Sequence, residues 1–319
     1  GDEVLLPAHT FTATAIPFLR RKCRVIFVDI DPDTFVMDVT DLKAKITKKT
    51  KAIVAVHLYG VAVDMDPVME LAKTNDIIVI EDCAQALGGS YKGQRLGSIG
   101  DFGCFSFHSQ KNITTLGEGG MLTLKNQSHW EKLKTVRKIG AKPFSGDRKR
   151  YWIPAMSNIV QEYDDVVPYN FAMGEGQAIA GSILLRRVDQ ITETRKVQYD
   201  QFSKAFEGVK EIKFQKVPSY CSSAFHLLPA RLNLGEEGRN LFIEEMVNKY
   251  RIKTVIQYYP LYNYDLFVKN GYGDSVCTST NDFYDNMVSF PFWSGMDSES
   301  IDYLIESISS SLKTVKESL

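Results

Sequence analysis

The sequence predicts an α/β protein built around a mostly parallel central sheet flanked by helices. Three apolar runs rich in β-branched residues, 25–29, 52–57 and 77–82, have the nearly continuous hydrophobic pattern of strands buried on both faces. A helix is predicted to begin at Asp66 and Pro67, because Asp caps free backbone N–H groups and Pro fits the first helical turn. This strand–helix–strand order indicates βαβ units with right-handed crossovers.

The later segments predict how the rest of the chain is divided. Residues 103–107 and 121–124 are short apolar runs close together in the sequence, so we expect two strands of a hairpin. The apolar spacing over 176–206 predicts one long helix. That helix would link a large domain, residues 1–175, to a smaller C-terminal α/β domain, residues 207–319.

The composition is that of a globular protein and excludes several classes of partner. The chain has 319 residues, of which 44% are hydrophobic, and Lys+Arg 38 against Asp+Glu 39 gives a net charge of −1. We therefore expect no nucleic-acid partner, and no apolar run approaches the ~20 residues of a membrane-spanning helix. Five widely spaced cysteines without a Cys-x-x-Cys pair favour reduced thiols, a cytoplasmic location and no metal site. The first residue is Gly, so we expect the natural start to be missing.

A carboxylate, a hydroxyl and a lysine follow the ends of predicted strands. Asp82 ends the third apolar run, and ligands of open α/β sheets bind beyond the carboxyl ends of strands. Ser106 and Lys111 follow the next predicted strand. These groups suit pyridoxal phosphate (PLP): a lysine binds its aldehyde, a carboxylate keeps its ring nitrogen protonated and a hydroxyl helps to hold its phosphate. Taken singly, the three residues are equally typical of a helix cap, a strand serine and a surface lysine.

A series of motifs resembles the DegT/DnrJ/EryC1/StrS family of PLP-dependent aminotransferases, which act on nucleotide-linked keto sugars. The resemblance covers nearly the whole chain, and it is the order and separation of the motifs that make it specific. It implies the fold type I of PLP-dependent aminotransferases. The motifs are residues 7–14, 28–31, 57–60, 81–88, 100–111, 117–121, 169–173 and 289–292.

The resemblance implies roles for five residues of one subunit. Lys111 aligns with the catalytic lysine that holds the cofactor as a Schiff base, and Asp82 with the partner of the pyridine nitrogen. Gln85 aligns with the glutamine that contacts the phenolic oxygen of the cofactor. Ser106 aligns with a phosphate-binding serine, and Phe11 occupies the position of an aromatic residue that stacks on the ring.

A sixth residue implies a homodimer with shared active sites. Asn170 matches an asparagine that reaches the phosphate bound by the neighbouring subunit. The chain also departs from the family, since Ala172 stands where an arginine is frequent and Tyr262 where a histidine often follows Tyr-Pro-Leu. The family's N-terminal Gly-Thr/Ser segment, which cradles the phosphate at a helix start, is absent from this sequence.

The implied reaction is a ping-pong transfer of an amino group from glutamate to a nucleotide-linked keto sugar, as in polysaccharide or antibiotic biosynthesis. One alternative is a non-catalytic PLP-binding sensor or assembly module of the same fold. A sugar dehydratase of the same family is less favoured, because its lysine is typically replaced by histidine. An amino-acid aminotransferase would use Arg231 or Arg239 for a carboxylate. The basic run Arg148–Arg150 suits either a diphosphate or plain solvation.

Overall fold

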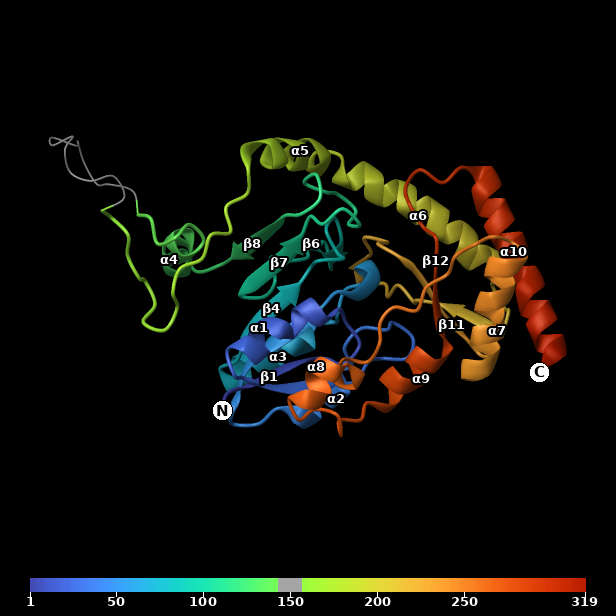
Figure 1. Cartoon of the computed structure of the whole chain (residues 1–319), viewed down its shortest axis with the longest axis horizontal. Coiled ribbons are helices and arrows are strands. Elements are labelled where there is room, and N and C mark those ends of the chain that lie inside the picture. The colour runs from blue at the N-terminus through green and yellow to red at the C-terminus, as the bar shows by residue number, and fades with distance from the viewer. Residues whose placement is uncertain (143–156) are drawn as a thin grey trace.

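The computed structural model describes residues 1–142 and 157–319, and its centre is a six-stranded sheet with the strand order β2-β1-β3-β4-β7-β8 (Figure 1). All neighbouring strands are parallel except β7 and β8, which form the predicted hairpin. The α/β class and the mostly parallel sheet are therefore confirmed. The strands are β1 (Glu3–Pro7), β2 (Arg24–Val28), β3 (Thr50–Val56), β4 (Ile78–Asp82), β7 (Phe102–Ser106) and β8 (Gly120–Leu124).

Apolar side chains on both faces of the inner strands hold this sheet in the interior. In β1 and β3, Leu5, Leu6 and Ile53 are fully buried, as expected for strands covered by helices on both sides. The C-terminal half of the chain contributes to the same core through Phe267 and Phe283. The surrounding helices are α1 (Ile16–Arg20), α2 (Val39–Lys45), α3 (Met65–Asn75), α8 (Asp265–Lys269) and α9 (Thr278–Asn286).

Helix α3 begins earlier than the sequence predicts. Asp64, in an extended conformation, precedes the helix, and Met65 is its first residue. Asp66 therefore does not cap the helix but lies in its first turn, where its carboxylate forms an ion pair of 2.5 Å with Lys92. An acidic residue in the first turn also interacts favourably with the helix dipole, so Asp66 marks a helix start without being the cap.

A second, antiparallel sheet with its own core lies in the C-terminal part. Its strand order is β12-β11-β9, and helices α6, α7 and α10 lie beside it in Figure 1. Phe202, Phe242 and Ile308 of these helices are fully buried in one cluster with the strands. The elements are α6 (Val188–Ala205), β9 (Ile212–Phe214), β11 (Leu228–Leu232), α7 (Gly235–Asn248), β12 (Met287–Phe290) and α10 (Ser298–Ser318).

The single helix expected over residues 176–206 is two helices, α5 (Glu175–Leu185) and α6. The break falls at Arg186 and Arg187, and the φ and ψ of Arg187, −102° and 0°, lie outside the helical region. Helix α5 has no buried residue, whereas α6 packs Tyr199 and Phe202 into the second core. The break therefore lets α6 follow its own core while α5 takes a different direction (Figure 1).

The remaining elements are short or lie at the periphery. Helix α4 and the chain around it project from the main body beyond β8 (Figure 1). Among the described residues, no helix is both long and apolar enough to cross a membrane. The elements are β5 (Ser90–Tyr91), β6 (Gln94–Arg95), β10 (Cys221–Ser222), α4 (Gln127–Val136), and the 3-10 helices η1 (Thr12–Thr14), η2 (Leu58–Gly60) and η3 (Leu261–Asn263).

Candidate active site

Asp82 ends β4 at the carboxyl edge of the central sheet, and two donors hold its carboxylate. Thr14 Oγ1 donates to Oδ2 at 2.8 Å, and the backbone N–H of Ala84 donates to Oδ1 at 3.1 Å. Thr14 belongs to η1, the 3-10 helix that follows β1. Thr10 Oγ1 lies 3.0 Å from Thr14 Oγ1. Each carboxylate oxygen has further lone pairs, so Asp82 can accept another N–H donor.

Lys111 lies on the loop between β7 and β8, with its amine near Asp82. Burial lowers the pKa of Lys111, while the negative charge of Asp82 acts in the opposite direction. A lysine of lowered pKa carries more of the neutral, nucleophilic amine near neutral pH. The structure therefore brings together the lysine and the carboxylate that the sequence singles out.

Ser106 is the last residue of β7 and lies at the start of the same loop. The backbone N–H of His108 points to Ser106 Oγ at a long 3.4 Å, and the carbonyl of His108 accepts from the backbone N–H of Lys111 at 2.9 Å. Because the hydroxyl oxygen of Ser106 is on the accepting side of this contact, its proton is available for an anionic ligand.

Gln85 is held by two hydrogen bonds that fix the orientation of its amide. The backbone N–H of Tyr59 donates to Gln85 Oε1 at 2.8 Å, and Gln85 Nε2 then donates to the hydroxyl of Tyr258 at 2.8 Å. Tyr258 Oη accepts this bond, so its own proton remains to be donated. Burial, with a contribution from the charge of Asp82, raises the pKa of Tyr258 to about 12, so this hydroxyl is protonated at neutral pH.

Phe11 and Tyr258 form an aromatic pair near the carboxyl edge of the sheet. Their ring centroids are 5.8 Å apart, and Phe11 keeps 54% of its surface exposed. An exposed ring in this position can stack on a planar ligand. The sequence analysis did not identify Tyr258. The only signal for it was its place in the aromatic-rich stretch 258–262.

Within the described part of one chain, Asn170 forms its hydrogen bonds with other residues than these. It is exposed on the segment 157–173, where it forms an isolated bridge with Lys138 after α4, and its Oδ1 accepts from the N–H of Ala172 at 3.4 Å. The structure thus places Asn170 and Ala172 together on the projecting part of the chain. No contact of Asn170 with Asp82, Ser106 or Lys111 is formed among the described residues.

Tyr262, which departs from the family pattern, is a core residue and has no place in the site. It is 2% exposed, its hydroxyl donates to Asn281 Oδ1 at 2.6 Å, and its ring packs at 5.6 Å from that of Phe27. Arg231 and Arg239 are likewise engaged elsewhere. Arg231 forms two 3.0 Å bonds to the Asp282 carboxylate.

Arg239 is 1% exposed and donates to the carbonyl of Tyr284 at 3.0 Å. The guanidinium of Arg239 is therefore buried against its own neighbours and is not placed to bind a substrate carboxylate. The basic run Arg148–Arg150 lies outside the described residues.

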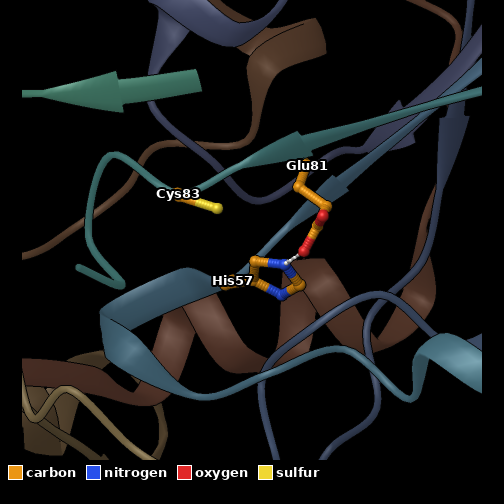
Figure 2. A group of neighbouring side chains, drawn as sticks. All are labelled: His57, Glu81 and Cys83. Atoms are coloured by element: carbon orange, nitrogen blue, oxygen red, sulfur yellow. Dashed lines mark hydrogen bonds and ion pairs between the residues drawn. The ribbon is translucent and has the colours of Figure 1, made fainter. Parts of the chain in front are cut away.

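Glu81, the residue before Asp82, forms a buried cluster of polar side chains with His57 and Cys83 (Figure 2). The N–H of Val63 donates to His57 Nδ1 at 3.1 Å, so the ring proton is on Nε2, which donates to Glu81 at 3.0 Å. Burial acts to raise the pKa of Glu81, but the bonds from His57 and from backbone N–H groups lower it below its usual value.

The same hydrogen bonds use the atoms that a metal ion would need. Both ring nitrogens of His57 are occupied, and Glu81 also accepts from the backbone N–H groups of Gly97 at 2.8 Å and of Ile99 and Gly100 at 2.7 Å. Burial raises the pKa of the Cys83 thiol well above its usual value, which disfavours the thiolate that binds metals. We therefore interpret this group as structural support for the end of β4.

A mostly parallel sheet with a half-buried lysine, a strand-end carboxylate and an exposed aromatic ring at one edge is the arrangement of PLP-dependent aminotransferases. The chain matches the model of the DegT/DnrJ/EryC1/StrS aminotransferase family over residues 1–309. It belongs to this family, as the resemblance of its motifs predicts, and aminotransferases of this family depend on PLP.

Two curated relatives carry names that specify a product or a substrate. GDP-perosamine synthase of Escherichia coli O157:H7 is 31% identical, with 97% of this chain and 78% of the relative covered. UDP-N-acetyl-3-dehydro-α-D-glucosamine 3-aminotransferase of Acidithiobacillus ferrooxidans is 34% identical, with 73% of this chain and 58% of the relative covered.

A solved structure with the same fold is that of Spr1654 from Streptococcus pneumoniae, described as a sugar aminotransferase. Its PLP form is 31% identical to this chain, with a TM-score of 0.86 and coverage of 99% of this chain and 82% of Spr1654. A PMP form of the same protein gives the same TM-score. Fold type I is therefore confirmed for this chain.

Proposed function

We propose that this aminotransferase transfers the amino group of an amino acid, glutamate, to a nucleotide-linked keto sugar. Relatives that cover most of this chain are named for GDP-linked and UDP-linked amino sugars, which supports this acceptor class. The observation that carries the proposal is that Asp82 and the loop of Lys111 follow two neighbouring parallel strands, β4 and β7, at the same edge of the sheet. The engagement of Arg231 by Asp282 weakens the case for an amino-acid acceptor.

The residues around Asp82 fit PLP in chemistry and in order. When bound, PLP supplies an aldehyde and a ring that accepts electrons. Asp82 would accept the N–H of the ring, Phe11 would stack on it, and the hydroxyl of Ser106 would hold the phosphate. Gln85 and Lys111 complete the set, Gln85 on the oxygen substituent of the ring and Lys111 at the aldehyde.

Lys111 is also the group that we propose moves the proton. An amine whose pKa is lowered by burial can hold a proton at Nζ and release it again near neutral pH, which is what a general acid–base catalyst needs. Because the same amine would serve the amino donor and the keto sugar, we propose that the donor product leaves before the acceptor binds, in a ping-pong scheme.

We further propose a homodimer in which Asn170 completes the partner's site. Large apolar side chains are exposed along α4, the segment 157–173 and α5, a clustering typical of subunit interfaces. These side chains are Trp130 (45% exposed), Ile159 (47%), Val167 (75%), Tyr169 (54%), Phe171 (67%), Ile179 (61%) and Ile183 (55%). A cytoplasmic location stays a prediction, consistent with five cysteines that form no disulfide.

The test of the substrate class is a screen of GDP- and UDP-linked keto sugars with glutamate, in which 2-oxoglutarate and the amino sugar are measured. We expect turnover of at least one sugar, loss of turnover in Lys111→Ala, and unchanged turnover in Lys51→Ala, since Lys51 is an exposed lysine of β3. Turnover of a plain 2-oxo acid with no sugar converted would refute the acceptor class. A cofactor absorbance band that responds to no amino donor would favour the sensor function.

A further inference from the structure

The loop that carries Lys111 is fastened to the rest of the molecule through the next residue, Asn112. Within residues 107–119 most hydrogen bonds join groups of the loop itself, such as Ser109 N–H to the carbonyl of Gly117 at 2.7 Å, and Gln177 of α5 donates to the carbonyl of Glu118 at 3.3 Å. Of residues 108–113, only Asn112 has a side chain bonded outside the loop among the described residues. The position of the Lys111 backbone therefore depends on what Asn112 contacts.

The two bonds of Asn112 leave one consistent arrangement of protons. Asn112 Nδ2 donates to the carbonyl of Ala224 at 2.8 Å, so Oδ1 faces Nδ1 of His226 at 2.9 Å. Since an amide oxygen only accepts, His226 Nδ1 carries the proton. Burial lowers the pKa of His226 well below its ordinary value, and the charges of Lys111 and Arg195 act in the same direction, so the ring is neutral.

The segment that receives Asn112 is itself held from two sides. Arg195 of α6, only 8% exposed, donates from Nη1 to the carbonyls of Phe225 at 3.0 Å and His226 at 3.2 Å. On the other side, the N–H of Ala224 donates to the carbonyl of Gly60 at 3.0 Å, and that of His226 to the carbonyl of Tyr59 at 2.9 Å.

Gly60 permits this close approach. Its φ is +105°, and a Cβ at this position would lie 2.7 Å from the backbone nitrogen of Phe225. The turn that presents Tyr59 to Gln85 is thus joined to the segment that holds Asn112. Gln85 and Asn112 are thus held by two segments that are hydrogen-bonded to each other, residues 59–60 and residues 224–226.

We propose that Asn112 and His226 are positioning residues that hold Lys111 in the half-buried site next to Asp82. This proposal rests on the proposed function of Lys111. If the side chain of Asn112 is removed, the part of the loop next to Lys111 loses its side-chain hydrogen bonds to Ala224 and His226, and the amine spends more time in water. The amine would then behave more like an ordinary lysine, with less of its neutral form near neutral pH.

The experiment measures the Lys111 amine directly in the full-length apoenzyme. Acetic anhydride labelling is followed against pH by mass spectrometry, with the exposed Lys51 as the internal reference. Asn112→Ala and His226→Leu should lower the labelling of Lys111 near neutral pH about tenfold, as expected for a pKa one unit higher. His226→Asn should stay close to wild type, because its amide can replace the Nδ1–H donor to Asn112.

A matched control separates positioning from general destabilisation. Asn75→Ala removes an exposed asparagine whose side chain, in the part of the chain that the structure describes, bonds to its own helix through the carbonyl of Leu71. It should leave the labelling midpoint of Lys111 unchanged. A midpoint in folded Asn112→Ala equal to that of wild type would overturn the proposal, and this variant decides alone if His226→Leu does not fold.

The proposed function can fail separately, and the failure would be visible in the wild-type protein. Pyridoxal phosphate followed by borohydride should attach to Lys111 of the wild type and be found on that peptide. If it does not, the cofactor role of Lys111 is wrong, whatever the variants do. If it does, while Asn112→Ala and His226→Leu show the wild-type midpoint and the wild-type affinity for pyridoxal phosphate, only the positioning role is wrong.

Discussion

At position 111 the surroundings, more than the residue type, decide what the amine can do. Burial removes water from the charged form of Lys111 and lowers its pKa, whereas the carboxylate of Asp82 stabilises that form. The balance of the two effects sets how much neutral amine is present. Lys51, in contrast, lies exposed on β3.

The first prediction follows from this balance. Asp82→Asn removes the charge that holds the pKa of Lys111 up, so the pKa should fall further. The pH at which labelling of Lys111 is half-maximal in the apoenzyme measures it. Affinity for pyridoxal phosphate should fall at the same time, because the ring N–H loses its acceptor. Asp302→Asn, which changes an exposed acid of α10, should alter neither, and an upward shift in Asp82→Asn would contradict the argument.

Residues of the site differ in how far the sequence could predict them. Asp82, Ser106 and Lys111 follow strands within one stretch of chain, so strand patterning and family motifs were sufficient to find them. Tyr258 and His226 arrive from far along the chain and belong to no short motif with a chemical meaning. Their partnership with Gln85 and Asn112 exists only after two cores have folded together.

At the scale of an element, β4 shows how a strand end is held in place. Asp82 faces the site, while the preceding residue, Glu81, is fully buried. Glu81 accepts a bond from His57 (Figure 2) and further bonds from backbone N–H groups of the loop 97–100. Because side chains alternate along a strand, fixing Glu81 on one face also fixes Asp82 on the other. The hydrogen bonds of Glu81 therefore also help to position Asp82 in the site.

The second prediction concerns this strand. Glu81→Gln keeps the size of the side chain but turns one acceptor into an N–H₂ donor that faces other donors, at Gly97, Ile99 or Gly100. We expect a loss of about 2–4 kcal/mol in the free energy of unfolding. Urea denaturation measures it, with the exposed Glu70→Gln as control. A loss below about 0.5 kcal/mol, the range of an ordinary surface substitution, would contradict the proposed support.

Helices were predicted less accurately than strands, for a physical reason. The run 52–57 is buried on both faces, and although Ile78 is 47% exposed, the continuous apolar pattern of the runs 25–29 and 77–82 also leaves few alternatives to a strand. The stretch 176–206 has helical spacing throughout, yet only α6 finds a core and α5 stays exposed. Spacing along a sequence does not reveal which neighbour each turn will meet, so the break at Arg187 was not predictable. The domain boundaries at 175 and 207 stay a prediction.

At the scale of the whole molecule, buried neutral histidines make stability depend on pH. Burial lowers the pKa of His9 from 6.5 to about 3 and that of His226 well below 6.5. Below about pH 6.5 these histidines bind protons in the unfolded chain but stay neutral in the native chain. Stability therefore falls as the pH falls below about 6.5. Each histidine contributes a slope of up to about 1.4 kcal/mol per pH unit.

The third prediction is that replacing one of them reduces that slope. We expect His226→Asn to lose less stability than wild type between about pH 6.5 and about pH 5, a window above the ordinary titration of Asp and Glu. Urea denaturation at several pH values measures it. His129→Gln, which changes an exposed histidine, should keep the wild-type slope. An unchanged slope in His226→Asn would mean that His226 is not held neutral in the native state.

The proposed sharing of active sites between two chains gives the last prediction. Suppose that Asn170 acts on the partner's site, and that a chain with Lys111→Ala pairs with a chain with Asn170→Ala. In a mixed dimer one site contains both substitutions and the other contains neither. Unfolding and refolding equal amounts together makes half of the dimers mixed, so about a quarter of wild-type activity should return. If Asn170 acted within its own chain, each site would keep one defect and mixing would restore nothing. Sedimentation of the mixture checks that dimers have formed, so an inactive mixture of dimers counts against the exchange of Asn170 between subunits.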